Sequence, residues 1–218
     1  YGSFANWAYN TEKIADTYPR LYSTIYPNEF RDAARPNRTS PIYEYQRQAN
    51  AVFGDYYGWE CPNYFPPKGE DSYEKPSWRR SNAFKHVDNE CKHLMNHVGI
   101  IDLTRFAKTK ISGPGAFDWL NKMTCQKIPG KDGRIALCPM LDHNGNFKSD
   151  MTVTRVSKEE FFCVTASVGK KHDQHWMLEN LPKDGTVIME DITYQMGCLV
   201  LAGPKSREVL AKAAYNDV

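Results

Sequence analysis

One carboxylate stands out in the stretch HNGNFKSDMTVTRV, which occupies positions 143–156. Asp150 falls inside a predicted strand, although aspartate is a poor strand former. Period-two alternation gives this strand an apolar face with Phe147, Met151 and Val153 and a polar face with Lys148, Asp150, Thr152 and Thr154. A carboxylate on such a face can manage a proton or stabilise a nearby cation. The alternative is a solvated acid paired with Lys148.

The histidines are weaker candidates for chemistry. His93 and His97 are four residues apart on a predicted helix, but Leu94 stands where a zinc-binding pair would carry its glutamate. His172 and His175 have no third ligand nearby in the sequence. We therefore predict that these histidines lie on the surface and that the chain has no metal site.

The six cysteines form no CxxC pair and are widely spaced. We therefore predict free thiols, no structural disulfide and an intracellular compartment. Cys138 and Cys163 lie in predicted strands rich in Leu, Val and Phe, which indicates small buried hydrophobes rather than nucleophiles. The sequence has no GxGxxG and no P-loop, and SGPG at 112–115 is predicted to start a helix.

Composition argues against several classes of partner. The chain has 218 residues, 41% of them hydrophobic, and its 28 basic and 26 acidic residues give a net charge of +2. This balance predicts no nucleic acid and no anionic membrane surface as partner. No apolar run approaches the roughly 20 residues of a membrane span. The sequence begins without a signal segment or an initiator Met, and we expect it to be part of a longer protein.

Regular elements are predicted from residue 81 onward. Helices are predicted at 86–99, 113–124, 173–181 and 204–214, and strands at 100–112, 134–141, 147–156, 160–168, 186–192 and 198–203. Asp88 is the predicted N-cap of the first helix and Gly99 its stop. Short turns between the second, third and fourth strands predict an antiparallel meander. The fold class is therefore α+β, with a mixed or antiparallel sheet and flanking helices.

The first 80 residues have a different composition, rich in Tyr, Pro, Asn and Arg. Eight prolines argue against long regular elements here, and only PIYEYQRQANAVFG at 41–54 looks helical. Abundant aromatic residues argue against disorder. We predict that residues 1–80 form an extended Pro/Tyr-rich arm lying along another domain or chain, and that residues 81–218 belong to a second domain.

Several blocks resemble the dimethylglycine and sarcosine dehydrogenases, whose folate-binding domain is similar to the glycine-cleavage T-protein, an aminomethyltransferase. The blocks are YGWECPNYF (57–65), GIIDLTRFAKTKISGPGA (99–116), SDMTVTR (149–155) and LVLAGPKSREVL (199–210). YPNEFRDAARPNRTSPIY (26–43) resembles the segment that joins their flavin and folate domains. The resemblance covers essentially the whole chain. It implies that 81–218 is the N-terminal part of an incomplete T-protein-like domain.

The resemblance also implies a function. These enzymes oxidise an N-methyl amine at FAD and pass the one-carbon unit to tetrahydrofolate, giving 5,10-methylenetetrahydrofolate. The acid matching Asp150 orients or activates the folate, which implies a catalytic and folate-binding role for this residue. Phe106 and Leu137 match positions that line the pterin, with core packing as the alternative. Thr165 and Ser167 match a strand end that contributes polar or backbone contacts, where T-proteins tend to have Asn.

The same resemblance implies partners. A flavin domain carrying FAD would precede Tyr1 and the rest of the folate domain would follow Val218, in the same polypeptide, as other chains or within an oligomer. The enzyme would be cytoplasmic in a bacterium or in the mitochondrial matrix of a eukaryote. The alternative is a T-protein-like fold kept as a non-catalytic binding or subunit-contact module. The sequence does not identify the amine.

Overall fold

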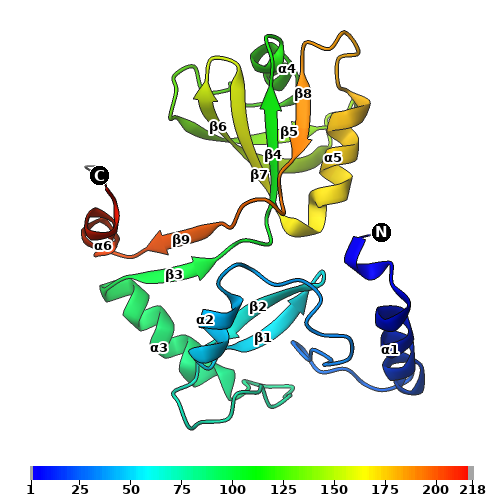
Figure 1. Cartoon of the computed structure of the whole chain (residues 1–218), viewed down its shortest axis with the longest axis vertical. Coiled ribbons are helices and arrows are strands. Elements are labelled where there is room, and N and C mark those ends of the chain that lie inside the picture. Colours follow the sequence, from blue (N-terminus) through cyan, green and yellow to red (C-terminus); the bar gives the residue numbers. More distant parts are fainter. Residues whose placement is uncertain (1, 216–218) are drawn as a thin grey trace. The chain divides into compact units, whose positions relative to one another are not determined.

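A computed structural model of the chain describes residues 2–215 (Figure 1). The chain forms two compact units. The first combines Tyr1–Leu103 with Leu199–Val218, and the second is Thr104–Cys198. These breaks differ from the division at residue 80, which concerns the domains of a longer protein and stays a prediction.

The first unit contains helices and two small antiparallel ribbons, β1–β2 and β3–β9. Its strands are β1 (Val52–Tyr56), β2 (Trp59–Tyr64), β3 (Gly99–Asp102) and β9 (Leu199–Ala202). Its helices are α1 (Trp7–Thr17), α2 (Tyr43–Gln48), α3 (Ala83–Asn96) and α6 (Ser206–Ala213), with 3-10 turns at Gly2–Phe4 and Tyr18–Arg20.

The region before residue 80 is more regular than its prolines indicate. Helix α1 was not predicted, yet it is capped by Asn6, whose side chain accepts a hydrogen bond from the Tyr9 backbone at 2.7 Å. The helix predicted at 41–54 is wrong in its second half. It ends at Gln48, and Asn50, with φ of 69°, turns the chain into β1.

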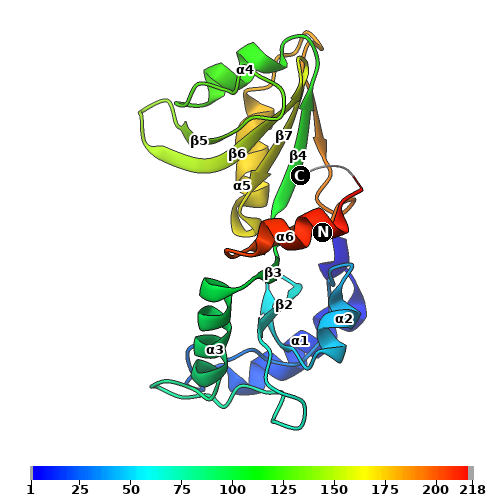
Figure 2. The same cartoon turned by 90° about the vertical axis from the view of Figure 1, so that its left-hand side faces the viewer.

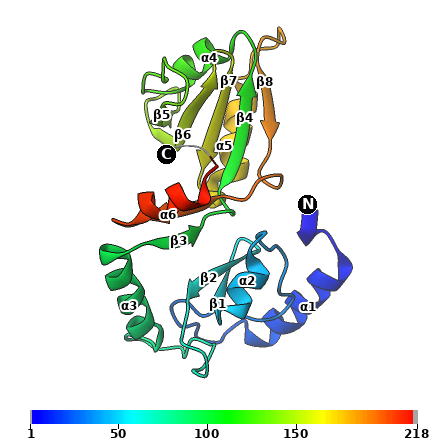
Figure 3. The same ribbon diagram turned by 60° about the vertical axis from the view of Figure 1, so that its left-hand side comes forward.

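The second unit is built around one antiparallel sheet. The strands lie side by side in the order β5–β6–β7–β4–β8 (Figure 3). They are β4 (Ala107–Ser112), β5 (Ile135–Leu141), β6 (Phe147–Ser157), β7 (Glu160–Thr165) and β8 (Ile188–Asp191). The unit also has α4 (Ala116–Met123), a 3-10 turn (Ser167–Gly169) and α5 (Lys170–Glu179). The α+β class and the antiparallel meander are therefore confirmed.

Two local predictions are wrong. The single strand expected at 100–112 is divided by a turn into β3 and β4, which belong to separate sheets. Asp88 lies inside α3, whose N-cap is Asn82, because α3 begins earlier than its apolar spacing indicated. Asp88 instead forms a pair with Lys92 one helical turn later, at 2.6 Å.

The core of the second unit lies on one side of its sheet, where α4 and α5 pack (Figure 2). We call this side the inner face and the opposite side the outer face. The fully buried residues of the inner face and its helices include Ile111, Leu120, Cys138, Met140, Met151, Val153, Phe161, Cys163 and Met177. Burial of each large side chain of this kind contributes about 1.5–3 kcal/mol. The core therefore fixes which residues of each strand face outward.

Candidate functional site

The outer face of the five-stranded sheet brings together side chains from four strands. Strand pairing sets Asp150 opposite Pro139 and sets Leu137 opposite Thr152. The same pairing continues from Thr152 to Val164 and from Val164 to Lys108. Because cross-strand partners point to the same side, these residues form one surface.

The carboxylate of Asp150 is exposed on this surface. Within residues 2–215, neither carboxylate oxygen of Asp150 has a hydrogen-bond or ion-pair partner, and the suggested pairing with Lys148 is not formed. The register between β5 and β6 shifts between Met140 and Leu141, so that Lys148 is left without a cross-strand partner. The period-two alternation of β6 is therefore interrupted at this residue. The Lys148 ammonium lies 4.9 Å from the centroid of the Trp176 ring.

Leu137 and Phe106 lie on the outer face with Asp150. The Leu137 side chain is 59% exposed, so it does not pack in the core of this structure. Phe106 is half-buried immediately before β4. Continuing the β4–β7 register by one residue sets Phe106 opposite Ala166, and continuing the β6–β7 register by two residues sets Asp150 opposite the same residue. Two strand spacings separate them, about 10 Å.

A buried lysine holds the segment that carries Phe106. Lys108 has no exposed surface, and its ammonium donates to the backbone oxygens of Thr104 at 2.7 Å and Phe106 at 2.9 Å. These charge-assisted bonds fix the turn before β4. The sequence analysis did not single out Lys108. The sequence carries no signal that distinguishes it, because β4 has a second lysine, Lys110, which is half-buried and pairs with Glu190.

Thr165 does not point to the outer face, and Ser167 lies beyond the end of β7. Thr165 is opposite Ala107, has 7% of its surface exposed, and points toward the inner face. Ser167 begins the 3-10 turn after β7 and is half-buried. A side-chain contact from Thr165 to an outer-face ligand does not follow from this geometry. Backbone contacts from this strand end stay a prediction.

Further apolar side chains lie on the outer face and were not predicted. Val164, opposite Thr152, is the one nearest Asp150; Ile135 and Phe162 are opposite Thr154, and Ile188 is on β8, three strands from β6. Ile135 is 63% exposed and Ile188 is 54% exposed, while Phe162 and Val164 are half-buried. Period-two alternation in EFFCVT was the available signal for the last two. An apolar floor beside an unpartnered carboxylate suits a flat heterocycle that has N–H groups at its edge.

The thiols do not provide a second reactive group on this sheet. Burial, followed by the nearby Cys138, raises the pKa of the Cys163 thiol to about 12. Burial also raises the pKa of the Cys138 thiol. Both cysteines are buried, as the sequence predicted, and stay protonated at neutral pH. All six cysteines are free in this structure.

His93 lies on α3 and His97 is its C-cap, both in the first unit, whereas His172 and His175 lie on α5 of the second unit. His93 and His97 stack with ring centroids 4.7 Å apart, and the Lys205 ammonium lies 3.1 Å from a His97 ring nitrogen. Among residues 2–215, His, Cys, Asp and Glu side chains do not gather in a group of three that could bind a metal ion.

In the same described range, no helix has the length and apolarity needed to cross a membrane.

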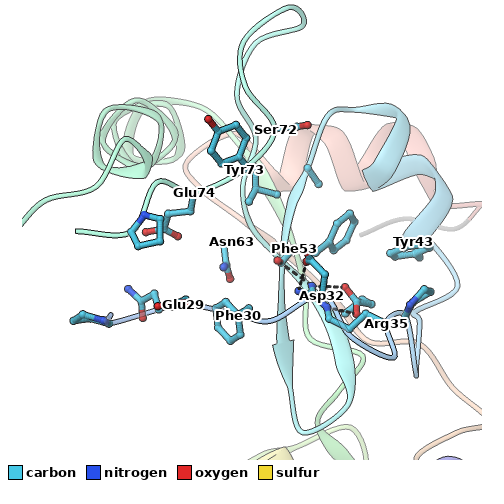
Figure 4. Close-up of a pocket in the computed structure, with 17 residues that line it drawn as sticks. Glu29, Phe30, Asp32, Arg35, Tyr43, Phe53, Asn63, Ser72, Tyr73 and Glu74 are labelled. Atoms are coloured by element: carbon cyan, nitrogen blue, oxygen red, sulfur yellow. Dashed lines mark hydrogen bonds and ion pairs between the residues drawn. The ribbon is translucent and has the colours of Figure 1, made fainter. Parts of the chain in front are cut away.

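A cavity of about 470 Å³ lies within the first unit (Figure 4). Phe30, Phe53 and Tyr73 contribute to its walls. Arg35 and Glu60 also line it, and form a two-pronged ion pair with N···O distances of 2.8 and 2.7 Å. Asp150 and the other predicted site residues belong to the second unit and do not line this cavity.

Comparison with known families identifies the chain. The profile of the GCVT N-terminal domain matches residues 42–218. The chain belongs to the GCVT N-terminal domain family. It is 34% identical to human mitochondrial dimethylglycine dehydrogenase over 220 residues, which cover 100% of this chain and 25% of the relative. The resemblance to the dehydrogenases is therefore confirmed.

A second relative is named as a regulatory subunit and not as a dehydrogenase. Mouse mitochondrial pyruvate dehydrogenase phosphatase regulatory subunit is 28% identical over 213 residues, 93% of this chain and 24% of the relative. The solved structure of glycine cleavage system aminomethyltransferase T from Bartonella henselae matches with a TM-score of 0.64 and 22% identity. It covers 81% of this chain and 43% of the other, and confirms the T-protein-like fold. The chain spans about a quarter of the length of these curated relatives.

Proposed function

We propose that this chain contributes a tetrahydrofolate-binding surface to a flavin-dependent N-methyl amine dehydrogenase, with Asp150 as its catalytic residue. The observation that carries the proposal is the exposed carboxylate of Asp150, which has no partner among the residues that the structure describes and lies on the same face as the 59% exposed Leu137. The family and the similarity to human dimethylglycine dehydrogenase support this ligand class.

The outer face suits the pterin of tetrahydrofolate. Leu137 offers apolar surface for a planar ring, and Phe106 a second apolar contact about two strand spacings from Asp150. Tetrahydrofolate, when bound, supplies the nitrogen nucleophile that accepts the one-carbon unit. The Asp150 carboxylate accepts hydrogen bonds from ring N–H groups and takes up the proton released at that nitrogen. Its negative charge also stabilises a cationic one-carbon donor.

The remaining parts of such an enzyme lie outside this chain. Oxidation of the amine requires FAD, which we assign to another domain of a longer polypeptide or to another chain. The rest of the folate domain completes the ligand site from the open side of the sheet. The human relative is named as a mitochondrial protein, which supports a mitochondrial location for a eukaryotic chain of this kind.

A second candidate is a non-catalytic contact module. It is favoured by one observation, namely that a relative which aligns over 93% of the chain is a regulatory subunit. On this alternative the outer face would bind a protein segment and Asp150 would pair with a basic residue of that segment. The two candidates differ in whether removal of the charge at position 150 affects a folate-dependent product.

The test is a paired assay of the full-length dehydrogenase that contains this chain. In the Asp150→Asn protein, flavin reduction by the amine persists, and formation of 5,10-methylenetetrahydrofolate falls by roughly 100-fold or more. Formaldehyde is released instead. The matched control is Asp118→Asn, which neutralises an exposed acid on α4 of the same unit. Wild-type rates of both products would remove Asp150 from the folate site.

A further inference from the structure

Helix α1 and its C-cap carry three large apolar residues on the outside, whereas Tyr9 is half-buried and packs its ring on Phe4. Trp7 is 86% exposed, Ile14 is 64% exposed and Tyr18, at the end of the helix, is 78% exposed. These residues are separated by 7 and 4 positions. At about 100° per residue they fall within roughly 40° of one another around the helix axis. They therefore form one narrow line along the helix.

The polar residues of α1 attach it to its own unit. Glu12 accepts a hydrogen bond from the Ala34 backbone at 2.5 Å. Lys13 lies 3.6 Å from Asp55. Asp16 lies 3.5 Å from Arg31, which follows the helix in the sequence. These three positions are on the opposite side of the helix from the apolar line.

This arrangement reverses the usual amphipathic pattern. A surface helix ordinarily turns its apolar face to the core and its polar face to water. Here hydrogen bonds and ion pairs hold the polar face against the unit. A helix with this pattern is attached to its own unit by one side and leaves a second apolar side free for another surface.

Three more exposed apolar residues follow soon after α1 in the sequence. Leu21 is 60% exposed, Tyr22 is 97% exposed and Ile25 is 55% exposed. We call the whole set the outward stripe, which consists of Trp7, Ile14, Tyr18, Leu21, Tyr22 and Ile25. Single exposed apolar residues are ordinary, but six large ones within residues 7–25 indicate an interaction surface. Trp and Tyr are also the residues most enriched at the energetic centres of interfaces.

We propose that the outward stripe docks onto another folded domain of the same polypeptide, through an apolar groove with acceptors for the Trp7 and tyrosine N–H and O–H groups. The length of the relatives supports this occupant. The human dehydrogenase is similar over all of this chain, stripe included, and three quarters of that relative lies outside the match. The polar side of α1 mixes Glu12 and Asp16 with Lys13, and so lacks the basic face of a helix that binds anionic lipid.

This inference does not depend on the folate proposal, because the stripe belongs to the first unit and Asp150 to the second. The test compares hydroxyl-radical oxidation of aromatic side chains in the 218-residue chain and in the full-length polypeptide that contains it. Trp7, Tyr18 and Tyr22 become at least 10-fold less reactive in the full-length protein. Trp78, which is 63% exposed in the same unit, is the internal reference outside the stripe.

A second measurement uses Ile14→Asp. The variant leaves the melting temperature of the 218-residue chain unchanged, because Ile14 has little contact within it, and lowers that of the full-length protein. Equal stripe reactivity in both proteins would overturn the proposal. So would protection that appears in the 218-residue chain as its concentration rises, since the occupant would then be a second copy. Protection by lipid vesicles alone would equally overturn it.

Discussion

The ammonium of Lys148 lies 4.9 Å from the centroid of the Trp176 ring and is not paired with Asp150, two residues away in the same strand. The irregular register between β5 and β6 makes this possible, because it removes Lys148 from the alternation that would have set it beside the acid. The cation thus serves the contact between the sheet and α5. Asp150 keeps its negative charge available to a ligand.

This relationship predicts a separation of roles. Lys148→Gln removes the cation–π contact and lowers the free energy of unfolding by about 0.5–1 kcal/mol. It leaves the yield of methylenetetrahydrofolate in the full-length enzyme unchanged, because the cation does not neutralise Asp150. Lys148→Arg, which keeps a cation over the ring, is the control for stability. A yield that changes in Lys148→Gln but not in Lys148→Arg would mean that Lys148 acts on the ligand.

Replacing the buried Lys108 is expected to lower both the stability of the protein and its affinity for tetrahydrofolate. Lys108→Met keeps the length and apolar stem of the side chain but leaves the Thr104 and Phe106 oxygens without their ammonium donor. Urea denaturation of the variant shows a loss of about 1–3 kcal/mol. Affinity for tetrahydrofolate, measured by calorimetry on the full-length protein, falls as well. Lost stability with unchanged affinity would separate Phe106 from the ligand.

Arg35 and Glu60 predict the largest stability effect in the first unit. Their side chains are 11% and 4% exposed, and the guanidinium also donates to the Phe53 backbone oxygen at 3.0 Å. Glu60→Gln removes the buried carboxylate, leaves the guanidinium only the exposed Asp32 at 3.6 Å, and costs about 3 kcal/mol. Glu44→Gln, which alters the exposed pair with Arg47, costs under about 1 kcal/mol. Equal effects in the two variants would show that the Arg35 site admits water.

Asp191 predicts a pH dependence. Burial opposes its ionisation, but hydrogen bonds from Lys170 and Thr193 outweigh burial and lower the pKa from 3.8 to about 2. The folded state therefore holds this proton less tightly than the unfolded state, and the stabilisation is present above pH 4 and lost as the pH falls toward 2. Since 33% of the side chain is exposed, we expect about 1 kcal/mol. Unfolding curves of wild type and Asp191→Asn should differ at pH 5 and converge near pH 2.

Gly113 predicts a steric effect at the start of α4. Its φ is 114°, and an added Cβ would overlap the Thr186 backbone oxygen. Gly145 also has positive φ, at 81°, but nothing lies within 4 Å of its Cβ position. Gly113→Ala should therefore lower the free energy of unfolding by more than Gly145→Ala, which carries only the backbone strain of about 1 kcal/mol. Equal losses would mean that the Thr186 segment moves aside.

The sequence predicted the inner face of β6 better than its ends. Met151 and Val153 are 1% and 0% exposed, as alternation required. Phe147, assigned to the same apolar face, is 66% exposed because the register irregularity precedes Met151. Such an irregularity depends on the partner strand and has no signature within the strand itself. The same limit explains Thr165, whose direction is fixed by pairing with Ala107.

Helix α1 was missed for a different reason. Prediction of a helix relies on an apolar stripe that seeks the core, together with few proline residues nearby. Trp7 and Ile14 point outward, and α1 contacts its unit mainly through ion pairs and hydrogen bonds, with one ring contact from Tyr9 to Phe4. A search for a core-facing apolar stripe therefore does not detect this helix. Asp150 was found because an acid is unusual in a strand, and the resemblance supplied its role. That its carboxylate has no hydrogen-bond or ion-pair partner among residues 2–215 could only come from three-dimensional structure.

The two hydrogen bonds from Lys108 have a consequence for binding kinetics and entropy. They fix the turn that ends at Phe106 before any ligand arrives. A flexible turn would have to be ordered on association, at roughly 0.5–1.5 kcal/mol for each immobilised side chain. Because that order is established during folding, the Phe106 side of the surface is preorganised. On the proposed function, ligand affinity reflects the contacts made and not the ordering of this turn, and we expect association in a single kinetic phase.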